Sequence, residues 1–424
     1  MLKGIPQPRR ADLTARALAF QNPRLPIPLR VVSRLPFARV LWPLDAAALK
    51  AKARRRTRLR DFGGLAPLDE PLGLLCRALE EDAQMHALGR WNVHSALLSA
   101  LSHRLRLEDL ARRRPHVFER PVPPPTVIAG LPGSGATFLQ RLLARDPATR
   151  WIPFWESVNP LPPATPVPAP DPRVKAGARM LSFLQWSCPE TIKMFELENE
   201  SACEETMPLA MGFAATFLEM CPLPGYLPWH AATDHTAGYA YLRRTLQAMQ
   251  WGRPEGERWL LRSSQHLAQF GPLTAAFPDG TVVQTHRDPV GSVLALSAML
   301  SYAFRQNFRH PNPHLIGHYV TEQTERLLRA AIRDRSPVDR RFVDVHFAQL
   351  NADPMGTVRR IYAAAGAELS EETERLMTVW YPRHRRGRHG VHSYEPADFG
   401  LSVPALRERF TFYYDHFAVP REGH

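Results

Sequence analysis

The sequence predicts an α/β fold, in which a doubly wound parallel sheet is flanked by helices and preceded by a helical N-terminal extension. Two observations support this prediction. Short apolar runs of strand length alternate with segments whose apolar residues recur at helical spacing, as in parallel sheets with crossover helices. The first strand-like run also ends in a glycine-rich turn, which leads directly into an amphipathic helix.

The N-terminal part of the chain divides into two predicted regions. Residues 1–60 are rich in Arg and Pro and show little periodicity, so we expect an extended basic arm. Residues 61–120 are expected to form a helical subdomain, because apolar residues recur there twice at helical spacing. These residues are Leu72, Leu75, Cys76 and Leu79, followed by Val93, Leu97, Leu98, Leu101 and Leu105.

Residues 121–424 are expected to form the α/β domain with helical insertions. Strands are predicted at residues 126–129, 258–262, 280–285 and 341–346, where short apolar runs occur. Helices are predicted at residues 173–219, 237–251, 290–303, 318–333 and 354–365. The strands alternate with helices, so their carboxyl ends should meet at one edge of the sheet.

The composition favours a globular protein with anionic partners. Of the 424 residues, 44% are hydrophobic and 22% charged, and the net charge is +13. This charge suits nucleotides, sulfated or phosphorylated compounds, nucleic acid or an acidic lipid surface, or it serves solubility alone. The four cysteines form no C-x-x-C pair, so neither a zinc site nor a disulfide framework is expected. Without a signal-like or membrane-spanning apolar segment, a cytoplasmic location is expected.

The glycine-rich turn has the layout of an anion-binding loop. Three glycines allow the backbone to curl so that its N–H groups converge, and the following helix adds its positive N-terminus. The loop is P-loop-like, but Ala136 stands where a Walker A motif has lysine, which argues against an ordinary kinase or ATPase. The alternative is a tight turn without a ligand. The predicted binding residues are Gly130, Pro132, Gly133, Ser134, Gly135, Ala136 and Thr137.

Three further motifs carry charged side chains. Arg287 follows the strand at 280–285 and is placed to bind a second phosphate, or alternatively to pair with Asp288. Arg262 ends the strand at 258–262, and His266 follows it. These two side chains are expected either to take part in a reaction or only to cap the next helix. A dense basic loop at residues 383–392 suits a phosphate, a nucleic acid or solvent.

These motifs in this order resemble the PAPS-dependent sulfotransferases, in particular their bacterial branch. The resemblance extends over roughly residues 60–418 and includes several shorter motifs. These are Trp155-Glu156, Asn159-Pro160, Phe342-Val-Asp-Val with Asp353-Pro354, and the segment from Ser393 to Leu401.

The resemblance implies a donor site and a reaction. The loop from Gly130 to Thr137 would bind the 5′-phosphosulfate of PAPS. Arg287 would bind its 3′-phosphate, together with Arg386, Gly387 and Arg388 of the basic loop. The family transfers a sulfuryl group to a hydroxyl or amine, and the resemblance requires no metal. The protein would mainly position groups and stabilise charge.

The resemblance also suggests catalytic residues, which we expect to be Glu204, Arg262 and His266. Glu204 lies in an acidic segment and is expected to accept the proton of the acceptor. Arg262 is expected to steady the leaving phosphate oxygen. The acceptor is expected to be small or lipid-like and to be selected by helices in residues 173–250 and 300–335.

The sequence departs from the family pattern at three positions. Gly133 replaces the usual basic residue, Ala136 replaces the first threonine of the loop, and Ala295 replaces a serine that follows the phosphate-binding arginine. A catalytically impaired protein that binds nucleotide or acts as a scaffold is therefore the main alternative. A P-loop NTPase is disfavoured by Ala136, and a nucleic-acid partner is not expected because no recognition module is present. Contact with a membrane surface stays open.

Overall fold

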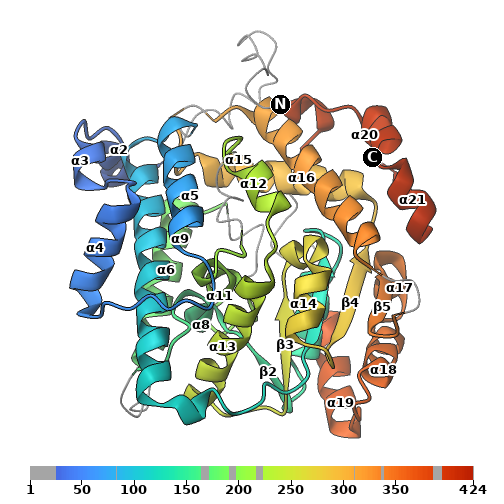
Figure 1. The fold of residues 1–424 in the computed structure, drawn as a ribbon. Helices are drawn as coiled ribbons and strands as arrows, with labels where there is room; N and C mark the ends of the chain where they lie inside the picture. The colour runs from blue at the N-terminus through green and yellow to red at the C-terminus, as the bar shows by residue number, and fades with distance from the viewer. Residues whose placement is uncertain are drawn as a thin grey trace.

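A single parallel sheet lies at the centre of the protein. The structure is a computed structural model, which describes residues 25–82, 84–163, 171–190, 197–215, 223–309, 311–335, 339–384 and 394–423. Within these residues, five strands form a sheet in the order β2-β3-β1-β4-β5 (Figure 1), and every neighbouring pair is parallel. They are β1 (Thr126–Gly130), β2 (Thr149–Trp151), β3 (Arg258–Arg262), β4 (Thr281–His286) and β5 (Phe342–His346).

Alternate residues of the central strands pack into two different cores, one on each face of the sheet. In β1, Val127 and Ala129 belong to a large core, whereas Ile128 packs with α7 (Ala136–Leu143) and α18 (Pro354–Ala364). In β4, Val282 and Val283 divide between the two cores in the same way. Burial on both faces explains why both strands contain runs of apolar residues. The predicted doubly wound α/β fold is confirmed.

The edge strand β2 was not among the predicted strands. It contains only Thr149, Arg150 and Trp151 and pairs with β3 alone. Its sequence has no apolar run, and its buried Arg150 is compensated by an ion pair with Glu156. The four predicted strands all exist, with ends within one residue of their expected positions.

The N-terminal helices correct one prediction. Residues 25–60 are not extended but contain α2 (Ile27–Ser33), α3 (Ala38–Leu41) and α4 (Ala46–Thr57), whereas residues 1–24 lie outside the described part. The side chain of Asp45 caps α4 by accepting the N–H of Ala48, and α4 buries Leu49 and Ala53. Alanine favours helix strongly, and only two buried positions are too few to give a visible period.

The predicted helices of residues 61–120 are α5 (Asp69–Glu81) and α6 (Ala87–Arg113), followed by the short η3 (Pro115–Val117). Leu72 of α5 and Leu97 of α6 lie in the same core as Val127 of the sheet. The helical extension and one face of the sheet therefore share a continuous hydrophobic core. In Figure 1 these helices form a layer on the left, beside the α/β part.

The remaining helices surround the sheet, as Figure 1 shows. Between β2 and β3 lie α8 (Phe154–Val158), α9 (Pro172–Ser187), α11 (Thr206–Met211), α12 (Leu227–Ala232) and α13 (Thr236–Gly252). Between β3 and β5 lie η4 (Ser264–Ala268), α14 (Phe270–Ala276), α15 (Pro289–Phe304) and α16 (Pro313–Arg333). After β5 lie α17 (Phe347–Ala352), α18, α19 (Glu371–Trp380), η5 (Tyr381–His384), η6 (Pro396–Phe399), α20 (Val403–Arg409) and α21 (Thr411–Phe417). The helical block predicted at 173–219 is interrupted, since residues 197–205 are not helical and residues 191–196 and 216–222 lie outside the description.

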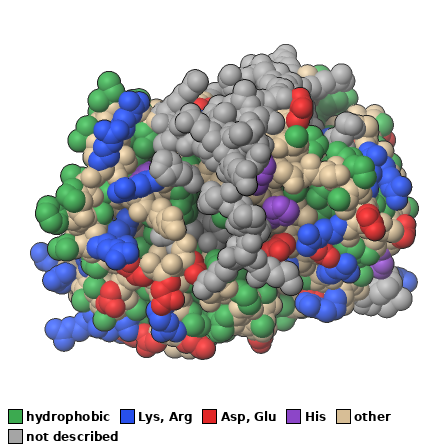
Figure 2. Space-filling model, turned by 90° about the horizontal axis from the view of Figure 1, so that it is seen from above, with side chains coloured by type: hydrophobic (Ala, Val, Ile, Leu, Met, Phe, Trp, Pro, Cys, Tyr) green, Lys and Arg blue, Asp and Glu red, His purple; other side chains and the backbone are tan. Residues whose placement is uncertain are grey.

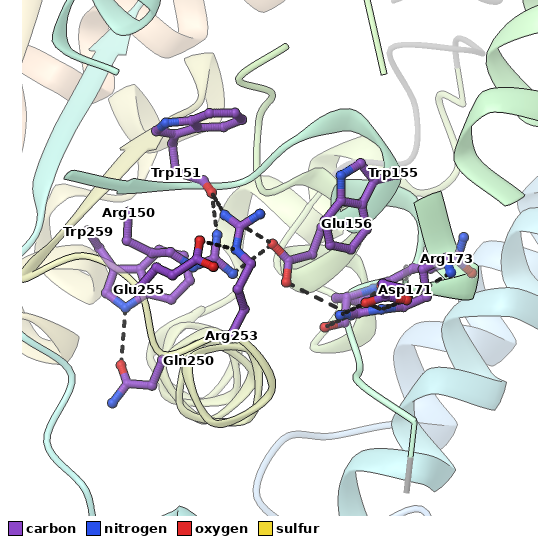
Figure 3. A network of polar contacts seen from close by, with 12 residues as sticks. Arg150, Trp151, Trp155, Glu156, Asp171, Arg173, Gln250, Arg253, Glu255 and Trp259 are labelled. Carbon is purple, nitrogen blue, oxygen red and sulfur yellow. Dashed lines mark hydrogen bonds and ion pairs between the residues drawn. The ribbon is translucent and has the colours of Figure 1, made fainter. Parts of the chain in front are cut away.

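A buried carboxylate holds the region after β2 in place (Figure 3). Glu156 of α8 is fully buried, and its Oε2 accepts from Arg150 Nη2 at 2.7 Å. Arg173 Nη1 and Arg253 Nη2 each lie 3.9 Å from the same carboxylate, and Arg173 stacks over the ring of Trp155. The Trp155-Glu156 motif therefore joins β2, α9 and the end of α13, which is a structural role.

Positive side chains are spread over the face of the molecule that Figure 2 shows. In Figure 2, Lys and Arg side chains lie on both sides of the face seen from above, with Asp and Glu between them. In the described part of the chain, no helix combines the length and the apolar character needed to cross a bilayer.

Candidate functional site

The glycine-rich loop adopts the conformation that its sequence predicts. It runs from the end of β1 to the start of α7, with Gly133 at φ +87° and Gly135 at φ +92°. A Cβ on Gly130 would lie 1.8 Å from Thr285 Oγ1, because β1 and β4 are paired at this point. All three glycines are therefore required by the backbone, two by their positive φ and one by a close approach.

The loop leaves the N-terminus of α7 open to an anion. Gly135 is the N-cap residue and has no side chain to cap the helix, so the first N–H groups lack an intrahelical acceptor. Ser134 is buried, and its hydroxyl lies 2.7 Å from Leu131 O and 2.6 Å from Thr285 Oγ1. Ser134 thus shapes the loop instead of facing outward, and Ala136 is buried behind it while Thr137 is half-buried.

Arg287 lies beside the loop, where β4 ends. Its Nη1 donates to Gly133 O at 2.8 Å, and its guanidinium stacks over Phe347. Its Nε and Nη2 donate to the two carboxylate oxygens of Glu422 at 2.7 and 2.6 Å. The alternative pairing with Asp288 is not observed, since Asp288 caps α15 through the N–H of Val290 and accepts from Tyr414. Arg287 therefore binds a planar anion directly next to the glycine loop.

Three residues of the basic loop were also predicted to bind the second phosphate, and Ala295 was noted as a departure from the family pattern. Arg386, Gly387 and Arg388 lie outside the described residues. Ala295 lies on α15, and the neighbouring Ser292 and Ser297 are buried in the same helix. The structure thus brings the glycine loop and Arg287 together.

The predicted base and the predicted cation are paired with each other. Arg262 Nη1 donates to Glu204 Oε1 at 2.6 Å, and Arg262 Nε donates to Gln140 Oε1 at 2.8 Å. Gln140 belongs to α7, so this pair lies against the helix that begins at the loop. The two side chains are partly accessible, at 15% for Arg262 and 27% for Glu204.

His266 is held from both sides by buried groups. Its Nε2 pairs closely with Glu205 Oε1, and its Nδ1 lies 2.7 Å from the hydroxyl of Tyr239. Burial raises the pKa of Tyr239 well above its usual value, so a protonated phenol lies beside Nδ1. Both ring nitrogens of His266 therefore have protein partners, and its expected catalytic role stays a prediction.

The sequence analysis selected Glu204 as a site residue and did not identify the adjacent Glu205. It is fully buried, and besides His266 it accepts the backbone N–H of Arg262 at 3.0 Å. Glu205 thus fastens the segment before α11 to the end of β3 and so places Glu204 beside Arg262. The sequence shows two adjacent glutamates without indicating which of them points inward.

A pocket opens next to the glycine loop. It is lined by residues of the loop, η4, α12, α15 and α16, and these helices include parts of both regions expected to select the acceptor. The lining residues are Leu131, Pro132, His230, Ser264, Gln265, Ala268, Gln269, Leu296, Leu300, Tyr319, Val320, Gln323, Thr324, Arg326 and Leu327. We call this the α16 pocket. His230 and Arg326 carried no motif that identified them in the sequence.

Comparisons with known proteins agree with this architecture. The family model described as "Sulfotransferase family" matches residues 124–371, which is more than half of the chain. The structure is similar to that of sulfotransferase STF1 from Mycobacterium tuberculosis H37Rv, at 27% identity and a TM-score of 0.74, over 86% of this chain and 98% of STF1. It is also similar to sulfotransferase STF9 from Mycobacterium avium, at 27% identity and a TM-score of 0.76, over 90% and 98% of the respective chains. No curated protein matched the sequence. The extent of the family match, on this fold, shows that the chain belongs to the sulfotransferase family.

Proposed function

We propose that this protein transfers a sulfuryl group from PAPS to a hydroxyl group of a small or lipid-like acceptor. The observation that carries the proposal is the 2.8 Å contact between Gly133 O and Arg287 Nη1. It joins two anion-binding features, the open N-terminus of α7 and a guanidinium fork. PAPS has two separate anionic groups, its 5′-phosphosulfate and its 3′-phosphate, and the two features suit them.

The residues present fit such a donor. Glycine at position 133 leaves the outer side of the loop free of a side chain, and the loop presents backbone N–H groups instead. The Glu422 carboxylate stands in for a phosphate, because it offers two oxygens to the fork of Arg287. In this assignment Gly130, Pro132, Gly133, Ser134, Gly135, Ala136 and Thr137 form the loop, and Arg287 holds the second anion.

The chain's own residues then have distinct tasks. Bound PAPS would supply the sulfuryl group and a phosphate leaving group. Arg262 provides the side-chain cation that Gly133 cannot, and Gln140 and Glu204 orient it beside α7. Glu204 is proposed as the acceptor of the hydroxyl proton. Its partial exposure and its second contact, from Ser263 Oγ at 3.3 Å, leave it accessible on one side.

Transfer of radiolabelled sulfate from PAPS to a panel of phenols, alcohols and hydroxy acids tests the proposed reaction. Arg287→Met should abolish transfer by removing donor binding. Arg359→Met provides the matched control, because Arg359 is an exposed arginine of α18 paired with Glu374. If the native protein bound adenosine 3′,5′-bisphosphate but labelled no compound of the panel, the reaction assignment would be withdrawn.

A protein that binds the nucleotide without catalysis is the second candidate. One specific observation favours it, namely that Gly133 lacks the usual cation while Arg262 is already engaged by Glu204 and Gln140. Losing a charge-stabilising donor costs on the order of 10² to 10³ in rate. Binding of adenosine 3′,5′-bisphosphate together with undetectable transfer would support this second candidate.

A further inference from the structure

The α16 pocket has mainly apolar walls. Leu131 comes from the glycine loop, Leu296 and Leu300 come from α15, and Val320 and Leu327 come from α16. Such walls suit the hydrocarbon part of a ligand, and a few polar groups among them then fix its orientation. Because Leu131 belongs to the donor loop, a ligand in this pocket lies next to the proposed donor site.

His230 is the first polar group of interest. It is only 2% exposed and lines the pocket, yet neither of its ring nitrogens has a hydrogen-bond partner of good geometry among the described residues. Burial lowers its pKa well below the usual value, with smaller contributions from His235 and Arg326, so the imidazole is neutral. The nearby backbone of Phe213 acts weakly in the opposite direction. A neutral imidazole offers one donor and one acceptor, and buried polar groups normally find partners. A ligand hydroxyl can pair with either kind of nitrogen, because it can both donate and accept.

Arg326 is the second polar group. Burial in protein surroundings lowers its pKa, although part of the side chain remains accessible from the pocket. Its Nε donates to the neutral Gln323 at 3.1 Å, and the described residues that line the pocket include no carboxylate. Burying a cation costs desolvation free energy unless an anion or several hydrogen bonds compensate the charge. An anionic group on the ligand would supply that compensation.

We propose that the α16 pocket binds an acceptor that carries both a hydroxyl and a carboxylate, with Arg326 holding the carboxylate and His230 hydrogen-bonded to the hydroxyl. The proposal rests on the proposed function, since it names the acceptor class of the same site. The apolar walls enclose the carbon skeleton between these two groups. Arg326 thus determines specificity, whereas His230 positions the oxygen that receives the sulfuryl group.

Calorimetric binding of a chain-length series of ω-hydroxycarboxylates and their methyl esters tests the proposal. The series is measured with and without saturating adenosine 3′,5′-bisphosphate. The best acid should bind about tenfold more tightly than its ester, since a charge-assisted contact contributes about 1.5 kcal/mol or more. Arg326→Met should remove this preference and leave the esters unchanged. His230→Phe should remove the advantage of the hydroxy acid over the same acid without its hydroxyl.

The matched control is Arg329→Met, because Arg329 lies on the same helix but is exposed and paired with Glu325. Equal binding of acids and esters, preference for esters, or no binding by either series would each overturn the proposal. Loss of adenosine 3′,5′-bisphosphate binding in Arg326→Met would also overturn it, because Arg326 would then serve the donor phosphate. Failure of the proposed function has a different signature, since the native protein would then not bind the nucleotide while the acid preference persisted.

An independent observation concerns the surface of α2 and α3. Among the described residues, ten large hydrophobic side chains are exposed, and six of them lie between residues 27 and 41. They are Ile27, Val31, Leu35, Phe37, Val40 and Leu41, with exposed fractions from 37% to 79%. We call this set the α2–α3 patch. Figure 1 shows these two helices at the outer left of the molecule, away from the sheet.

The α2–α3 patch also contains exposed cations. Arg30, Arg34 and Arg39 are exposed in the same segment, while Leu25 and Leu29 turn inward and pack against Leu88. Apolar side chains interspersed with arginines are typical of segments that lie in the interface of an anionic membrane. We propose that the α2–α3 patch binds the surface of an anionic lipid bilayer, and a lipid-like acceptor would reach the protein from there.

Co-sedimentation with phosphatidylcholine vesicles, with and without phosphatidylserine, tests this second proposal. The protein should bind the anionic vesicles more strongly, and added salt should weaken binding. A Phe37→Ser/Val40→Ser variant should lose most of its binding to anionic vesicles. A Val379→Ser variant, changed at another exposed valine, should keep that binding. Equal binding to both vesicles, binding unaffected by Phe37→Ser/Val40→Ser, or concentration-dependent dimerisation that this variant abolishes would overturn the proposal.

Discussion

Arg287 and Glu422 form a forked ion pair beside the glycine-rich loop, with N–O distances of 2.7 and 2.6 Å. The contact is reinforced from the backbone, because Asp288 Oδ2 accepts the N–H of Glu422 at 2.8 Å. The segment after α21 is thereby fastened to the start of α15. A carboxylate of the protein itself thus occupies the guanidinium that we assign to the 3′-phosphate of the donor. It follows that Glu422 and the donor compete for Arg287.

Replacing Glu422 tests this competition. Glu422→Gln should raise the affinity for adenosine 3′,5′-bisphosphate about fivefold, because a partly exposed pair contributes about 1 kcal/mol that the nucleotide must otherwise displace. Titration calorimetry measures the change. Glu408→Gln serves as the control, since Glu408 is an exposed glutamate of α20. Unchanged or weaker nucleotide binding by Glu422→Gln would show that the two do not compete.

Arg262 is expected to be the cation that replaces the one missing at Gly133. Arg262→Met should lower kcat for sulfuryl transfer on the order of 10² to 10³, with little effect on nucleotide affinity. Arg262→Lys should retain part of the activity, because it keeps the charge but loses the fork that binds Gln140 and Glu204. Steady-state kinetics with saturating PAPS separates these effects. Full activity in Arg262→Met would remove Arg262 from the mechanism.

Glu204 requires a test of its own, since it is either the base or only the partner that orients Arg262. If Glu204 is the base, Glu204→Gln should lower kcat and also remove the acidic limb of its pH profile. If it only orients Arg262, kcat should fall while the shape of the pH profile is preserved. The profile, not the loss of rate, therefore decides the role.

Gly130 tests whether the loop geometry depends on the close approach of β1 and β4. Gly130→Ala should destabilise the protein by about 1–3 kcal/mol, because the new Cβ would collide with Thr285 Oγ1. Nucleotide binding should be lost together with stability. Gly73→Ala is the matched control, since its Cβ meets no atom within 4 Å and α5 should gain about 0.5–1 kcal/mol. Urea unfolding compares the two, and equal effects would contradict the steric explanation.

Buried histidines predict acid lability. Burial lowers the pKa of His103 to about 3, with smaller contributions from Arg106 and Arg56. Because the unfolded chain binds a proton near the usual His value of 6.5, this contribution to stability is complete above pH 6.5. It is lost progressively as the pH falls toward the folded value of about 3. Burial also lowers the pKa of His86, His94 and His235, which adds to the same trend.

Urea unfolding measured from about pH 7.5 to about pH 5 checks this trend. The free energy of unfolding should decrease as the pH is lowered, by up to about 1.4 kcal/mol per pH unit for His103 alone. His103→Gln should make the dependence shallower, because the substituted side chain cannot titrate. His116→Gln, at an exposed histidine, serves as the matched control. Stability that does not change over this range would contradict neutral burial of His103.

The sequence predicted those features that depend on local backbone chemistry. The loop glycines were identifiable because their spacing after a strand requires positive φ or a close approach, and the structure has both. Strands β1, β3 and β4 were identifiable because their burial leaves apolar runs, and the edge strand β5 was identifiable because its valines alternate with polar residues. In contrast, β2 carries no apolar run, and α4 is an alanine-rich helix with only two buried positions.

Long-range pairing could not be predicted in the same way. Arg287 was expected at a phosphate site, but nothing in the sequence connects it to Glu422. Of two adjacent glutamates, Glu205 is buried and Glu204 is accessible, because the chain direction at the start of α11 decides which one faces His266. His230 carries no motif, and only the folded chain brings it to the α16 pocket beside residues of α16 and of the loop.

Titration calorimetry with adenosine 3′,5′-bisphosphate tests most directly whether the glycine loop and Arg287 form one donor site. The native protein should bind the nucleotide with equimolar stoichiometry, Arg287→Met should lose that binding, and Arg359→Met should retain it. The absence of binding heat in the native protein at millimolar nucleotide, or unchanged binding in Arg287→Met, would contradict the assignment of this site to PAPS.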